Sequence, residues 1–189
     1  MAAKAADASG VGWLADLGSH PAAWVLAVAL LARAAPTGRL AAVGSAVFFA
    51  VMSLAYYAFA VVVLGFDLRG QLVLLAAWTV LSLTAVPLFA VVVHLATRHR
   101  GVLPGAVLAG AAALALADRT LWELWLAATG DAPGVLHPVQ AVAGVVVALV
   151  VAGVLPRHGR TRAVALVLLA PAAVAATWGV DLLYGLLPG

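Results

Sequence analysis

Long apolar runs separated by short polar segments dominate the chain, and Pro, Gly and Arg residues mark the ends of these runs. A helix needs about 20 apolar residues to cross the roughly 30 Å hydrocarbon core of a bilayer. The pattern therefore predicts an all-α fold, a polytopic transmembrane helix bundle of about six spans in a single integral membrane domain over residues 1–189. The predicted spans are residues 21–35, 39–64, 71–97, 102–129, 137–155 and 161–187.

Prolines are expected to start or kink three of these helices. The first run has only 15 residues, so either residues 11–20 extend it through a kink at Pro21 or Pro21 starts the helix. Whether residues 11–35 cross the bilayer stays open on sequence grounds. Pro87 and Pro171 lie inside the third and sixth runs, where a missing N–H and a bulky ring predict kinks.

Composition narrows the class of protein. Hydrophobic residues make up 66% of the chain and charged residues 9%, against about 45–50% and about 25% in soluble domains. So few charges cannot cover a water-soluble surface, which excludes an ordinary soluble enzyme, a disordered chain and a nucleic-acid binder. The chain has no cysteine, which excludes disulfides, thiolate metal sites and cysteine nucleophiles.

The arginines predict an orientation. Three loops between predicted spans carry seven of the ten basic residues and no acid: Arg33, Arg39, Arg98, Arg100, Arg157, Arg160 and Arg162. Cytoplasmic loops of membrane proteins are enriched in Lys and Arg. These loops should therefore face the cytoplasm of a multi-pass plasma-membrane protein, with both termini outside. The same arginines could bind anionic lipid headgroups, although a purely topogenic role is simpler.

Small residues recur every four positions in two predicted spans, as Gly105, Ala109 and Ala113, and as Gly144, Ala148 and Ala152. Such stripes allow helices to approach closely in lipid, where no hydrophobic force drives them together.

Polar and aromatic side chains gather toward the predicted outer ends of the spans. Asp118, Trp122 and Trp125 share one helical face, and Thr177, Asp181 and Tyr184 share another. An intramembrane carboxyl group is a candidate functional residue, because burial forces it to hold a proton or recruit a cation. We therefore expect an outward-facing ligand pocket formed by Asp118, Arg119, Glu123, Asp181, Tyr56, Trp78, Trp122 and Tyr184.

An interfacial alternative accounts for the same residues. Residues 102–117 already extend about 24 Å at about 1.5 Å per residue, so the helix could reach the outer interface near Asp118. Arg119 and Glu123 would then form an exposed ion pair, and Trp122, Trp125 and Trp178 would belong to the aromatic belt. The sequence leaves both interpretations open.

No cofactor is predicted. The only lysine, Lys4, lies outside the spans, which excludes a retinal Schiff base on the last helix. His94 has no histidine at its depth in another span and is better explained as a core or interface residue. His20 and His137 are weak metal-ligand candidates, since each precedes a proline and equally suits a helix start.

Four short segments carry a family resemblance: WLADLGSHPAAWVLAVALLAR at residues 13–33, AYYA at 55–58, LWELW at 121–125 and DLLYG at 181–185. Together they resemble a family of uncharacterised small integral membrane proteins of actinobacteria, in which an acid-x-x-aromatic element lies in a late helix. The resemblance implies a multi-helix membrane protein and no particular reaction.

Two functions remain. In the first, the protein binds or transports a small solute or cation in the outward-facing pocket. In the second, it is a structural or accessory subunit that packs against a membrane protein partner or a second copy of itself. An enzyme is the weakest hypothesis, because the chain contains no metalloprotease, serine-hydrolase or phosphate-binding-loop motif. The lipid bilayer is the one partner common to all of these hypotheses.

Reporter fusions test the orientation. A reporter active only in the cytoplasm should be active when fused after Arg100 or after Arg160, and inactive when fused after Arg69 in the opposite predicted loop. Activity confined to the Arg69 fusion would reverse the predicted topology.

Overall fold

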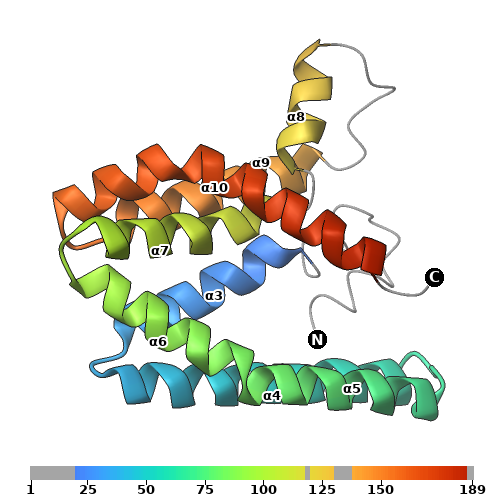
Figure 1. Ribbon diagram of the computed structural model, residues 1–189. Coiled ribbons are helices and arrows are strands. Elements are labelled where there is room, and N and C mark those ends of the chain that lie inside the picture. Colours follow the sequence, from blue (N-terminus) through green and yellow to red (C-terminus); the bar gives the residue numbers. More distant parts are fainter. Residues whose placement is uncertain (1–19, 118–119, 130–137, 187–189) are drawn as a thin grey trace. The chain divides into compact units, whose positions relative to one another are not determined.

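Helices make up the structure, a computed structural model that describes residues 20–117, 120–129 and 138–186. No strand occurs among these residues, so the predicted all-α fold is confirmed. The helices are α3 (Pro21–Ala34), α4 (Gly38–Val62), α5 (Leu68–Leu83), α6 (Ala85–Arg98), α7 (Val102–Ala113), α8 (Thr120–Thr129), α9 (Pro138–Leu149) and α10 (Gly159–Leu186), with a 3₁₀ turn η1 (Leu114–Leu116) and a π-helical turn η2 (Val150–Val154) (Figure 1).

Three helical segments are long and apolar enough to cross a membrane: Gly38–Val62, Leu68–Arg98 and Gly159–Leu182, of 25, 31 and 24 residues. The shorter apolar helices Pro21–Ala34, Val102–Leu116 and Gln140–Val154 have between 10 and 17 residues, less than a crossing requires. By length and composition, the described residues thus supply three candidate spans of a membrane protein where the sequence predicted six.

The chain divides into two compact units. Residues 28–94 belong to the first unit, and residues 20–27 together with residues 95–186 belong to the second. The single membrane domain expected from the sequence stays a prediction.

An antiparallel hairpin of α4 and α5 forms the larger part of the first unit (Figure 1). Thr37 caps α4, with its hydroxyl oxygen accepting a bond from the Leu40 N–H at 3.2 Å, and Asp67 caps α5 by accepting from the Gly70 N–H at 2.8 Å. Threonine and aspartate are favoured at such positions because the first N–H groups of a helix lack internal partners. Gly65 makes the turn with a left-handed φ of 69°.

Pro87 breaks the third predicted helix upstream of itself. The proline ring collides with the carbonyl group of residue i−4, which is Leu83 here. Accordingly, α5 ends at Leu83 and α6 begins at Ala85, which confirms the predicted kink. In α10, by contrast, the chain stays helical through Pro171, and the helix changes direction along its length (Figure 1).

His20 and His94 form hydrogen bonds with backbone groups near the two ends of α3. The helix begins at Pro21, as one of the two sequence interpretations expects, and the Ala22 N–H donates to His20 Nδ1 at 3.3 Å. Near the opposite end, His94 Nδ1 donates to the Ala32 carbonyl oxygen at 3.0 Å. His94 is buried, which confirms that it is a core residue.

One continuous helix over residues 102–129 stays a prediction, because Asp118 and Arg119 lie outside the described residues. α7 and the 3₁₀ turn end at Leu116, and α8 begins at Thr120. The apolar run ends at this point, where the polar sequence Asp118, Arg119 and Thr120 follows Ala117. The apolar helix before these residues is therefore shorter than a bilayer crossing.

The second unit packs α7, α9 and α10 together through small residues. All six residues of the two predicted stripes are buried, from Gly105 to Ala113 on α7 and from Gly144 to Ala152 on α9 and η2. Gly105 permits the closest approach, because a Cβ atom there would lie 2.6 Å from the Val164 Cβ and 2.9 Å from the Thr161 carbonyl oxygen of α10. The predicted role of small residues is confirmed at this contact.

Substitution of Gly105 tests this contact. Gly105→Ala should lower the free energy of unfolding by about 1–3 kcal/mol, because the new methyl group must push α7 away from α10. Gly110→Ala is the matched control, since no heavy atom lies within 4 Å of the added Cβ, and it should be neutral or stabilise the helix. Equal destabilisation of both variants in detergent unfolding would contradict the packing.

Candidate functional site

Two tyrosines of α4 and a tryptophan of α5 form an aromatic cluster in the first unit. Tyr57 is buried, and its ring meets that of Tyr56 edge to face with a centroid separation of 5.1 Å. A side-chain hydrogen bond joins Tyr57 to Trp78. Because the indole N–H can only donate, the Tyr57 hydroxyl oxygen accepts it.

An open groove of about 230 Å³ runs between α4 and α5 beside this cluster. It is lined by Leu54, Tyr57, Ala58, Val61 and Val62 of α4 and by Leu68, Gln71, Leu72 and Leu75 of α5. Only Tyr57 and Gln71 carry polar side-chain groups, so the groove is far more apolar than the predicted pocket. It is smaller than the roughly 300–1,000 Å³ of common ligand pockets, so an occupant would be small.

The side chains of three predicted site residues are described. Tyr56 and Trp78 lie in the first unit, where Tyr57 connects them. Asp181 is exposed on α10 in the second unit. Asp118 and Arg119 lie outside the described residues, as do the side chains of Trp122, Glu123 and Tyr184. A pocket that these residues share with Tyr56 and Trp78 therefore stays a prediction.

Tyr57 and Gln71 are not among the site residues predicted from the sequence. A signal for Tyr57 is present in the chain: Ala41, Ser45, Phe49, Ser53 and Tyr57 recur every four residues and are all buried on α4. This spacing places them along one helical face. The same spacing explains why Tyr57 is buried and its neighbour Tyr56 less so. Gln71 carried no comparable signal.

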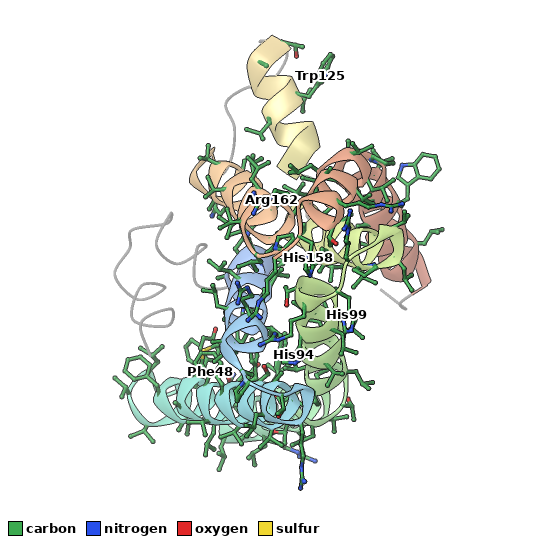
Figure 2. The ribbon with its side chains drawn as sticks, turned by 90° about the vertical axis from the view of Figure 1, so that its left-hand side faces the viewer. Phe48, His94, His99, Trp125, His158 and Arg162 are labelled. Carbon is green, nitrogen blue, oxygen red and sulfur yellow. The ribbon has the colours of Figure 1, made fainter. Side chains whose placement is uncertain are left out.

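Two tryptophans favour the interfacial alternative where they are described. Trp125 on α8 is 61% exposed and Trp178 on α10 is 70% exposed. Figure 2 shows Trp125 projecting from its helix. Tryptophan with its apolar ring exposed and its N–H available is typical of the membrane–water interface. For these two residues, an aromatic-belt position fits better than the wall of a pocket.

The histidine candidates give no support to a metal centre in the described part of the chain. His20 is buried, and its Nδ1 atom is engaged in the cap of α3. His137 lies outside the described residues. Among the residues that the structure does describe, no group of three or more His, Asp or Glu side chains is close enough to hold a metal ion.

Comparison with known proteins adds no relative. No protein-family model matches the chain, and neither a curated protein nor a solved structure matches it. The resemblance to small actinobacterial membrane proteins stays a prediction.

A double-mutant cycle tests the Tyr57–Trp78 bond. Tyr57→Phe and Trp78→Phe should each destabilise the protein, and the double variant should cost less than their sum. We expect a coupling energy of about 0.5–1.5 kcal/mol from reversible unfolding in detergent, because one hydrogen bond is lost in each single variant. Strictly additive effects would show that the two side chains do not interact.

Proposed function

We propose that the chain is a small multi-pass protein of the plasma membrane that binds a small solute on its outward-facing side. The arginine distribution supports the orientation, because it assigns the α4–α5 turn and Asp67 to the outer surface. The three long apolar helices support the membrane location. The observation that carries the solute proposal is the groove between α4 and α5, which begins beside this turn.

The lining of the groove defines the chemistry of the solute. Seven of its nine lining residues are Leu, Val or Ala, which favour an apolar body. Gln71 is half-buried and offers an amide donor and acceptor, and the Tyr57 hydroxyl group is already bonded to Trp78. A small, mostly apolar solute with one hydrogen-bonding group fits this combination.

The predicted carboxyl groups extend the proposal to cations. Asp181 is exposed near the end of α10, which the predicted topology assigns to the same side of the membrane as the groove. A carboxylate at that level would attract a cation or a protonated solute. On this proposal, Asp181→Asn would weaken cation uptake and leave binding of an uncharged solute unchanged.

An accessory-subunit function is the second candidate. The segment Leu68–Arg98 exposes large apolar side chains along much of its length, including Val73, Val80 and Leu88 at 68%, 60% and 69% exposure. In a bilayer such a face can contact lipid or the helix of another protein. On this hypothesis a stoichiometric partner copurifies with the protein from native membranes.

Photolabelling with an aliphatic diazirine alcohol tests the groove, because such a probe has an apolar body and one hydroxyl group. We expect saturable labelling of peptides that contain residues 54–62 and 68–75. Ala58→Trp should abolish it by filling the groove. Ala77→Trp is the matched control, since Ala77 is an exposed alanine of α5 outside the lining, and it should retain the labelling.

Labelling that rises linearly with probe concentration, or that is equal in the two tryptophan variants, would contradict solute binding at the groove. If a stoichiometric partner also copurified with wild type and with Ala58→Trp alike, the accessory-subunit hypothesis would replace it.

A further inference from the structure

Two segments of the second unit, distant in sequence, are joined at the end of α6. The carbonyl oxygens of Thr97, Arg98 and His99 accept hydrogen bonds from the Arg157 N–H at 3.0 Å, from His158 Nε2 at 2.9 Å and from the Thr161 hydroxyl at 2.9 Å, respectively. The last carbonyl groups of a helix have no internal partner. The second segment therefore caps the C-terminal end of α6.

The Thr161 hydroxyl group joins the two segments through two hydrogen bonds, one as donor and one as acceptor. It donates to His99 and accepts a bond from the Gly101 N–H at 3.2 Å, and the residue is fully buried. We call residues 97–101 together with residues 155–162 the arginine double loop. His99, His158 and Arg162, labelled in Figure 2, belong to it.

Positive charge accumulates on the double loop. It carries five arginines, of which Arg98 is half-buried and Arg100, Arg157, Arg160 and Arg162 are exposed. Residues 68–117 and 132–180 contain no Asp or Glu. In the described part of the chain, these four exposed guanidinium groups have no carboxylate partner.

The helices that begin at the double loop add to its positive potential. α7 starts at Val102, directly after the first segment, and α10 starts at Gly159, within the second segment. The N-terminal end of a helix carries roughly half a positive charge. A bound anion would therefore meet two helix N-termini in addition to the arginine side chains.

Exposed apolar residues border the double loop on both segments. Leu103 follows Arg100 and is 75% exposed, Val154 precedes Arg157 at 66%, and Val167 lies little more than one helical turn beyond Arg162 at 75%. A ligand that joins a phosphate group to an acyl chain can bind the arginines with the phosphate group and contact the apolar residues with the acyl chain. A free phosphate ion would use the arginines only.

We propose that the arginine double loop is a binding site for the phosphate groups of anionic phospholipids. A guanidinium group binds phosphate through two parallel N–H···O bonds, and the hydrogen bonds between the two segments hold their arginines in one place. A purely topogenic role would require the positive charge of the arginines but not the hydrogen bonds between the two segments. The Arg33 and Arg39 loop supplies the comparison, because it shares the predicted cytoplasmic location.

Native mass spectrometry of the full chain in neutral detergent tests the site, with phosphatidylglycerol and phosphatidylcholine added at equal concentrations. We expect wild type to retain phosphatidylglycerol preferentially. Arg100→Gln/Arg160→Gln should lower this preference by about fivefold for each arginine removed. Arg33→Gln/Arg39→Gln removes the same charge elsewhere and should leave the preference unchanged.

Three results would overturn the proposal. Wild type could retain both lipids equally, which would show no preference for an anionic headgroup. The two glutamine double variants could lose the preference equally, which would show that net charge and not the double loop determines it. Inorganic phosphate at the concentration of the lipid could displace phosphatidylglycerol completely, which would identify a site for a soluble anion.

If the glutamine variant fails to insert into the membrane, a variant that conserves the charge still tests the site. Arg100→Lys/Arg160→Lys retains the topogenic charge, but an ammonium group cannot form the two parallel bonds to phosphate. We expect its preference for phosphatidylglycerol to fall by roughly twofold or more. An undiminished preference would contradict a site built from guanidinium groups.

Discussion

Backbone polar groups at a helix end have no partner within the helix, and hydrocarbon offers them no water. In this chain a few histidine and threonine side chains supply those partners. His94 bonds to a carbonyl group near the end of α3, and His99 and His158 bond to carbonyl groups of α6. His20 and Thr37 serve the first N–H groups of α3 and α4. Polar residues are rare here, and those at the helix ends hold the backbone in place while the helix surfaces remain apolar.

Two groups of polar side chains remain that do not bond to the end of a helix in this way. In the first unit, Tyr57, Trp78 and Gln71 border an apolar groove, which is the basis of the proposed solute site. In the second unit, hydrogen bonds between two distant segments gather five arginines, and the described residues supply no carboxylate partner for the four exposed ones. The predicted topology assigns these two features to opposite sides of the membrane. One would then serve solute binding outside, and the other would bind anionic lipid on the cytoplasmic side.

The pattern of apolar residues in the sequence predicted the all-α fold, because long continuous apolar runs are typical of helices. The kink at Pro87 and the close contact at Gly105 follow from local sterics and were therefore predictable. The 3₁₀ turn at Leu114–Leu116 was not, since no proline or glycine marks it. Contacts between distant parts of the chain were harder to predict. Only the four-residue spacing along the buried face of α4 distinguishes Tyr57 from Tyr56. Nothing in the neighbouring sequence indicates that Thr161 joins residues 97–101 to residues 155–162.

The central claim is that the exposed apolar faces of these helices lie in lipid, and cysteine labelling tests it directly because the chain contains no native cysteine. Val73→Cys and Val167→Cys place a thiol on side chains that are 68% and 75% exposed on α5 and α10, and Arg160→Cys places one at an exposed position in the first turn of α10. In open membrane fragments, a water-soluble maleimide should label Arg160→Cys rapidly and the other two variants only after denaturation in detergent. Rapid labelling of Val73→Cys and Val167→Cys in untreated membranes would contradict the account.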